Sequence, residues 1–98
     1  MVTTDEITDP QNLKAWLELN GDRVQDGNTK TMIFSCSNII SYVSNYMTLM
    51  PGDVIVTGTP PGVGMGFNPP KYLKGGDVMR LGIEGLGEQS QKVKAYKA

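Results

Sequence analysis

Histidine is absent from the sequence, and cysteine occurs once, at Cys36. Histidine is the side chain that most readily changes charge near neutral pH and the commonest metal ligand, so the usual general base is missing. With one cysteine as well, the chain cannot assemble a zinc site, or a Ser–His or Cys–His pair, from its own residues. Any chemistry therefore has to rest on carboxylates, lysine, tyrosine or backbone amides. Cys36 cannot form an internal disulfide, and we expect a small buried residue there, in a reducing compartment.

Long apolar runs and blocks of like charge are also missing. Nine basic residues stand against ten acidic ones, which gives a formal net charge of -1. We therefore predict neither a nucleic-acid partner nor a membrane-spanning segment. The polar, acidic start at residues 1–6 does not resemble a secretory signal, which predicts a cytoplasmic protein. A length of 98 residues allows one small domain with a thin core.

Two kinds of hydrophobic period divide the chain. Apolar residues alternate with polar ones over residues 13–19, which predicts a strand with one buried face. Asn20–Gly21 supplies a tight hairpin turn, with residues 23–25 as a short return strand. From Ser37 the apolar residues follow a helical period, so we predict a helix that is capped by Ser37 and ended by Pro51–Gly52.

The second half of the chain predicts further strands. Residues 32–34 form an apolar core anchor, and Val54–Val56 predicts a short buried strand. Residues 79–83 alternate again, and residues 89–96 return after a glycine turn as a polar, edge-like strand. The sequence thus predicts a mostly β fold of the α+β kind, with one main helix, in a single domain over residues 1–98.

The loop TGTPPGVGMG, at residues 57–66, holds four glycines and two prolines. A phosphate cradle is disfavoured, because such a site needs a helix directly after the glycines and Pro69–Pro70 leaves no room for one. Two alternatives stay open, a rigid structural turn and one wall of a ligand site. For the second, Thr59 is held extended by the proline after it, and Gly58 lets a ligand approach the backbone.

The carboxylates do not form a cation site in the sequence. Asp53 and Asp77 each follow a glycine at a turn, where an aspartate bonds nearby backbone amides. The acidic groups at residues 5–9 are expected to be solvated or capping, and Glu84 and Glu88, which flank the last turn, are expected to be exposed. No spacing gathers two or three carboxylates around one cation, so no metal ligand is predicted.

Several motifs together resemble the fumarylacetoacetate hydrolase family. The longest is LMPGDVIVTGTPPGVG at residues 49–64, and shorter ones occur in the family's order. They are VTTDEI at 2–7, NG at 20–21, NT at 28–29, MIF at 32–34, YLKGGDV at 72–78 and IEGLG at 83–87. The resemblance extends over nearly the whole chain. It is nearest to the bacterial branch that acts on 2-oxo and diketo acids or on ureidoglycolate.

Membership of that family implies a β-rich roll of mixed sheets, usually dimeric, of which this chain resembles the C-terminal half. Members are typically Mg²⁺- or Mn²⁺-dependent enzymes that hydrolyse a carbon–carbon bond in acylpyruvate-like acids, or that decarboxylate, isomerise or lyse related acids. The metal holds the carboxylate and keto oxygens of the substrate and stabilises an enolate. The family threonine that contacts the substrate's oxygens corresponds to Thr59, with Gly58 as the close backbone beside it.

The resemblance also implies what these residues lack. The family's Glu-x-Glu metal ligands, a later aspartate, an active-site lysine and a His/Glu pair on a lid all precede the matching region, and Met1 corresponds to an internal residue. We therefore expect a partial catalytic domain that binds no metal alone, and we assign no catalytic residue. Three hypotheses follow: the truncated C-terminal segment of an enzyme, inactive by itself; a stand-alone, non-catalytic oligomerising or binding module; or half of a split enzyme. Uncovered strand faces predict a homodimer or higher oligomer.

Overall fold

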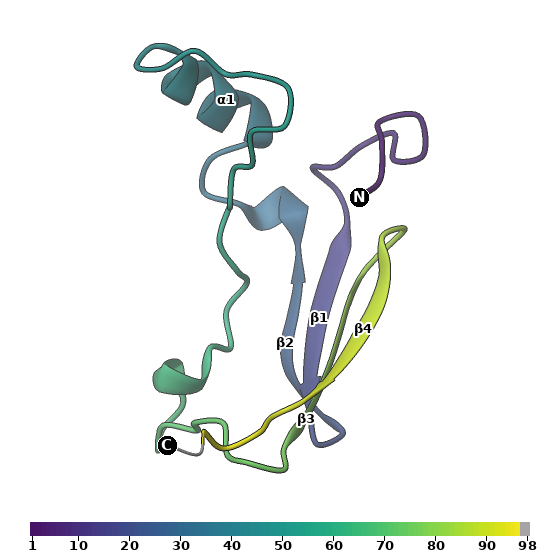
Figure 1. Cartoon of the computed structure of the whole chain (residues 1–98), viewed down its shortest axis with the longest axis vertical. Coiled ribbons are helices and arrows are strands. Elements are labelled where there is room, and N and C mark those ends of the chain that lie inside the picture. The colour runs from purple at the N-terminus through teal and green to yellow at the C-terminus, as the bar shows by residue number, and fades with distance from the viewer. Residues whose placement is uncertain (97–98) are drawn as a thin grey trace.

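The computed structural model describes residues 1–96 and shows one antiparallel sheet with a helix apart from it (Figure 1). The strands follow the order β2-β1-β3-β4 across the sheet. They are β1 (Lys14–Leu19), β2 (Asp22–Asn28), β3 (Val78–Ile83) and β4 (Gly87–Lys92). The helix is α1 (Cys36–Ser44), and two short 3₁₀ helices are η1 (Thr29–Thr31) and η2 (Gly64–Gly66). The predicted mostly β fold with one main helix is confirmed.

The β1–β2 hairpin turns at the predicted dipeptide. Asn20 and Gly21 have φ values of 53° and 92°, so both residues adopt the left-handed conformation that a tight hairpin requires. The Asn20 side chain also ties the turn to β3, because its Nδ2 donates to Asp77 Oδ1 at 2.9 Å and its Oδ1 accepts from the Val78 amide at 2.9 Å. The hydrogen bond from Asn20, followed by one from the Lys74 amide, lowers the pKa of Asp77.

Substitution of Asn20 separates backbone conformation from hydrogen bonding. Asn20→Gly removes both side-chain hydrogen bonds. Asn20→Ala removes the same bonds and also places an alanine in the left-handed conformation, so it should be less stable than Asn20→Gly by about 1 kcal/mol. Chemical denaturation of both variants measures the difference.

Because the pKa of Asp77 is lowered in the fold, its stabilising contribution is present above the unfolded pKa and is lost as pH falls through the folded value. The loss of stability of Asn20→Gly relative to the parent chain should therefore become smaller in acid. A loss that does not change with pH would contradict a stabilising hydrogen bond between Asn20 and Asp77.

The two faces of the sheet differ in character. Leu17 and Leu19 on β1 lie opposite Leu81 and Met79 on β3, and Leu19 is buried. On the opposite face, the guanidinium carbons of Arg23 and Arg80 lie 4.6 and 5.3 Å from the Trp16 ring centroid.

Charged groups pair around this tryptophan. Glu18 accepts from Arg23 at 2.9 Å. Arg80 bonds Glu88, and that bond raises the pKa of Arg80. These ion pairs lie on the face of the sheet that carries Trp16, called the outer face below. They do not shield this face from solvent, since both arginines are exposed.

The helix is shorter than predicted and begins earlier. Its N-cap is Ser35, not Ser37, because the Ser35 hydroxyl accepts from the Asn38 amide at 3.2 Å. It ends at Ser44, well before Pro51. At this end, Ser44 Oγ and Asn45 Nδ2 both donate to the Ser41 carbonyl. Cys36, predicted as a buried residue before the helix, is its first residue and is only half-buried.

Two predicted core segments are not buried. Val54–Val56 forms no strand, and the exposed fractions of Val54 and Val56 are 84% and 88%. In the predicted anchor at residues 32–34, Ile33 and Phe34 are 91% and 65% exposed. A strand needs a neighbouring chain to satisfy its backbone, and in the part of the chain described none pairs with residues 54–56. Both predictions are therefore wrong for this chain by itself.

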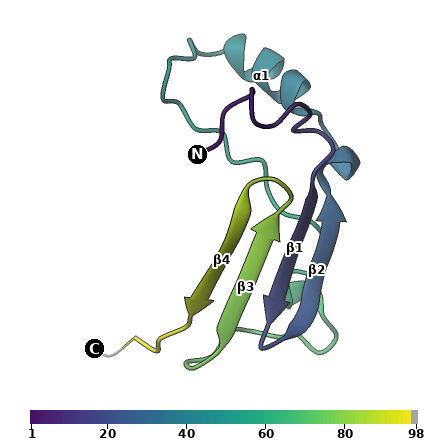
Figure 2. The same cartoon turned by 90° about the vertical axis from the view of Figure 1, so that its right-hand side faces the viewer.

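The molecule is open. Its accessible surface is 8066 Å², whereas a compact monomer of its mass exposes about 5,500 Å². Its radius of gyration is 16.1 Å, against about 13 Å for a compact domain of this length. Figure 2 shows why, since α1 lies beyond one end of the sheet and does not cover a face. In residues 1–96, no helix is both long and apolar enough to span a bilayer.

Candidate functional site

The loop at residues 57–66 lies close against β2 at two glycines. A Cβ atom added at Gly27 would lie 2.6 Å from Pro60 Cβ, and one added at Gly62 would lie 2.0 Å from the Val24 carbonyl oxygen. Gly62 also has a φ of 108°, which side chains rarely adopt. Glycine is therefore required on both sides of the contact, and the loop is held in place where it crosses the strand.

The far end of the loop is fixed in the same way. A Cβ atom at Gly64 would lie 2.1 Å from the Lys71 carbonyl oxygen, and the Lys71 amide donates to the Gly64 carbonyl at 2.9 Å. Between them the chain makes only the three-residue η2. The glycines are thus not followed by a helix whose amides could hold a phosphate, as predicted.

Thr59 meets a buried polar side chain from β2. The Gln25 side chain is only 9% exposed, and its Nε2 donates to Thr59 Oγ1 at 3.0 Å and to the Pro60 carbonyl at 2.7 Å. The Thr59 hydroxyl can in turn donate to Gln25 Oε1 at 3.3 Å. Thr59 itself is exposed, and Gln25 contacts its hydroxyl from the β2 side.

Gly58 lies beside this hydroxyl with open space around it. Its φ is 91°, and no heavy atom lies within 4 Å of the position that a Cβ would occupy. The two predicted site residues, Thr59 and Gly58, thus form one accessible edge of hydroxyl and bare backbone. Their contact with a ligand stays a prediction.

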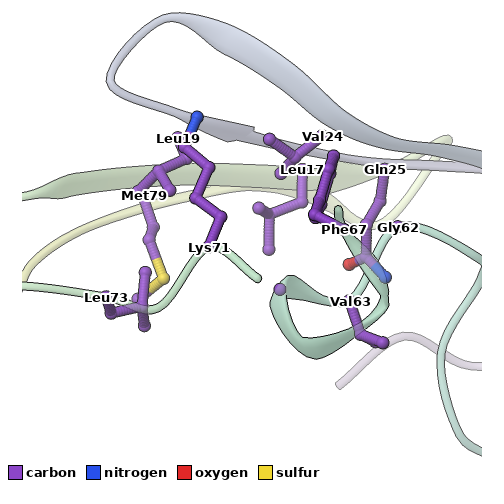
Figure 3. A pocket seen from close by; sticks show the side chains of 11 residues that line it. Leu17, Leu19, Val24, Gln25, Gly62, Val63, Phe67, Lys71, Leu73 and Met79 are labelled. Carbon is purple, nitrogen blue, oxygen red and sulfur yellow. The ribbon is translucent and has the colours of Figure 1, made fainter. Parts of the chain in front are cut away.

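A small apolar cavity separates the loop from the sheet (Figure 3). Its volume is about 210 Å³. Apolar side chains line most of it, namely Leu17, Leu19, Val24 and Met79 from the sheet, Val63 from the loop, and Phe67 and Leu73 from the segment after the loop. Gln25 reaches its wall, whereas Thr59 does not line it. The cavity is therefore the apolar side of the loop, and the polar edge at Thr59 is a separate feature.

The acidic residues do not gather into a metal site. Asp53 and Asp77 each accept a backbone amide three residues earlier, from Met50 and Lys74, at 2.8 Å, as predicted for turn aspartates. Among residues 1–96, no group of three or more His, Cys, Asp or Glu side chains is placed to hold an ion. The described residues therefore do not fit the Mg²⁺ or Mn²⁺ that the family resemblance implies.

The sequence did not point to Gln25. A regular two-residue hairpin would pair Leu17 with Val24 and turn Gln25 toward the outer face. Instead the register shifts between Leu17 and Glu18, so Leu17 pairs with Gln25. The extra residue of this bulge turns Gln25 toward the loop. No pattern of residues in the strand predicts the bulge.

Known proteins match the chain over nearly its whole length. Residues 1–94 match the family model described as fumarylacetoacetate hydrolase, C-terminal. A protein of Burkholderia multivorans, provisionally named a hydrolase, is 62% identical over 99% of this chain and 35% of its own length. The fumarylacetoacetate hydrolase of Exiguobacterium antarcticum is 46% identical with a TM-score of 0.91, covering 97% of this chain and 34% of that one.

A maleylpyruvate hydrolase from Sphingobium sp. SYK-6, solved with manganese (II) and pyruvate, is also similar. It is 37% identical with a TM-score of 0.84, over 96% of this chain and 33% of that one. The chain thus spans about a third of the length of the relatives it matches. From the family match and these structures, the chain belongs to the fumarylacetoacetate hydrolase family and corresponds to its C-terminal part.

Proposed function

We propose that this chain supplies one wall of a fumarylacetoacetate-hydrolase-type active site for 2-oxo or acylpyruvate acids. The observation that supports the proposal is the edge formed by Gly58 and Thr59, where a rigid loop presents a hydroxyl beside bare backbone. The Thr59 hydroxyl binds an oxygen of the acid, and Gly58 lets the ligand approach. This edge orients the substrate for hydrolysis, decarboxylation, lysis or isomerisation at the bond next to the keto group.

The remainder of the site lies, in this proposal, on protein outside the described residues. Residues 1–96 offer no set of side chains for a divalent cation, while the similar maleylpyruvate hydrolase was solved with manganese and pyruvate. The chain therefore contributes binding and orientation, and has no turnover alone. This arrangement covers both a C-terminal segment of an enzyme and one half of a split enzyme.

A non-catalytic, self-associating module is the second candidate function. It is favoured by the apolar surface that the open fold exposes, including Val54, Val56 and Met65 at 84%, 88% and 74%. In this proposal a second copy of the chain covers that surface. Both functions can belong to one protein, because the exposed apolar surface and the Thr59 edge involve different side chains.

A chimera tests the enzymatic proposal. This chain replaces the matching 35% of the Burkholderia multivorans relative, and turnover of acylpyruvate and oxaloacetate is measured with Mg²⁺ or Mn²⁺. We expect activity from the chimera and none from the chain alone. Turnover by the chain alone would overturn the proposal that its residues are one wall only. Activity on mixing the chain with the rest of the relative as a separate protein would favour a split enzyme.

Thr59 can be tested in the same chimera. Thr59→Val keeps the shape and removes the hydroxyl, which should lower kcat/KM by roughly tenfold or more, the effect of a hydrogen bond to a charged group. Thr59→Ser, the matched control, keeps the hydroxyl and should keep most of the activity. Steady-state kinetics measure both variants. Equal kinetics for Thr59→Val and the parent chimera would remove Thr59 from the site.

A further inference from the structure

We propose that Gln25 is a positioning residue that sets the Thr59 hydroxyl as a hydrogen-bond donor toward a carboxylate or keto oxygen of the bound acid. This inference rests on the proposed function and deepens it. It begins from burial: Gln25 is the one polar side chain classed as buried among residues 1–96, with 9% exposed. A buried amide needs partners for its polar atoms, and all of the partners it has lie in residues 59–60.

The Pro60 carbonyl fixes the orientation of the amide. A carbonyl oxygen only accepts hydrogen bonds, so the atom 2.7 Å away from it must be Nε2 rather than Oε1. The second hydrogen of Nε2 is then directed to Thr59 Oγ1 at 3.0 Å. Both amide hydrogens of Gln25 are therefore bonded. A flipped amide would place Oε1 against the Pro60 carbonyl oxygen, and two acceptors do not bond each other.

This orientation decides what Thr59 can offer a ligand. A hydroxyl has one hydrogen to donate and two lone pairs that accept, and one lone pair is occupied by Gln25 Nε2. The same hydroxyl can donate its hydrogen to Gln25 Oε1, with Thr59 Oγ1 and Gln25 Oε1 3.3 Å apart, which is long compared with about 2.8 Å for an ordinary O–H···O bond. A charged ligand oxygen makes a shorter, stronger bond and takes this hydrogen. The edge can therefore bind ligands that present an oxygen acceptor, as 2-oxo acids do.

The Pro60 ring also holds the loop and the strand together. Pro60 lies against Gly27, two residues along β2 from Gln25, and as a proline it keeps Thr59 extended. Strand and loop are thus held together by the Gln25 hydrogen bonds and by the contact between Pro60 and Gly27. Gln25 acts on the substrate only through Thr59, which makes it a positioning residue and not a catalytic one.

Gln25→Glu in the chimera reverses the polarity of the pair. An ionised carboxylate only accepts, so it repels the Pro60 carbonyl and draws the Thr59 hydrogen away from the substrate. We expect KM for an acylpyruvate to rise roughly tenfold, with a smaller fall in kcat, because the lost contact is made already in the ground state. Protonation restores one donor, so the deficit should shrink as the pH falls toward the pKa of the introduced carboxyl.

Gln25→Met is the matched control, since it keeps the length and removes every hydrogen bond. Its KM should rise without the recovery in acid, and it carries the test if Gln25→Glu does not fold. In the Thr59→Val background, neither Gln25 substitution should change KM further, because the hydroxyl that Gln25 positions is gone.

The outcomes separate the two proposals. If Thr59→Val leaves the chimera unchanged, the proposed role of Thr59 fails. If Thr59→Val raises KM but Gln25→Glu and Gln25→Met do not, the positioning role of Gln25 is wrong while the proposed function stands. An effect of Gln25→Glu that is undiminished in the Thr59→Val background, or one without pH dependence, would also overturn the inference.

Discussion

Gly64→Ala should destabilise the loop by about 3 kcal/mol or more, a cost at the upper end of what an added methyl group causes in a packed site. The new Cβ would lie 2.1 Å from the Lys71 carbonyl oxygen, and a backbone atom cannot rotate away as a flexible side chain can. The loop must then move off its second attachment point. The amide of Lys71, which donates to the Gly64 carbonyl at 2.9 Å, would lose its partner.

Gly66→Ala is the matched control, because it lies at the other end of the same 3₁₀ helix. Its Cβ would meet only Val63 Cγ2, at 3.7 Å, an ordinary contact. This variant should be neutral or more stable by about 0.4–1 kcal/mol, through the lower entropy of the unfolded chain.

Two measurements on the intact chain compare these variants, namely denaturant midpoints and the hydrogen exchange of the Lys71 amide. Gly64→Ala should lower the first and accelerate the second, whereas Gly66→Ala should leave both nearly unchanged. Equal behaviour of the two variants would show that the loop does not lie against Lys71. It would then have a single attachment, at β2.

The elements that the sequence predicted well are those whose signals are local. The β1–β2 hairpin follows from alternation and from the tolerance of Asn20–Gly21 for left-handed backbone, and the turn before β3 follows from Asp77 bonding the Lys74 amide. These interactions involve residues close in sequence. The polar edge position of β4 was likewise predicted, because all of its residues are polar or glycine.

The failures involve interactions that no local pattern encodes. Val54–Val56 has the composition of a strand, but a strand exists only when another chain segment lies beside it. Gln25 escaped notice because the bulge at Leu17–Glu18 reverses which face it occupies. For the site itself, the family resemblance proposed Thr59 and Gly58, and their contact with a ligand stays a prediction, whereas the hydrogen bonds between Gln25 and Thr59 join residues far apart in the sequence and follow from no local pattern.

The open fold connects these failures to function. The loop is closely packed at Gly27, Gly62 and Gly64, yet the segment leading into it, residues 54–56, is exposed. Rigid geometry at the Thr59 edge is what substrate orientation requires. In the proposal made above, a partner covers the exposed apolar segments next to that edge. The proposed function therefore combines one wall of a ligand site with an apolar surface that a partner covers.

The purified chain should be a dimer or a higher oligomer at micromolar concentration. It exposes about 2,600 Å² more than a compact monomer of its mass, calculated from its surface of 8066 Å², whereas a standard interface buries about 800 Å² on each partner. Burial of the apolar part of this excess favours association. Multi-angle light scattering measures the mass, and a clean monomer would contradict the proposal that a second copy covers this surface.

A charge placed at Val56 should reverse the association. Val56→Asp should not destabilise the isolated chain, because the side chain is 88% exposed there. In an oligomer that buries this segment, however, an unpaired carboxylate is costly, so the mass should shift to that of a monomer. Thr4→Asp adds the same charge at an exposed polar position and should leave the oligomer intact. If both variants keep the parent mass, residues 54–56 lie outside the interface, and another of the exposed apolar segments must form it.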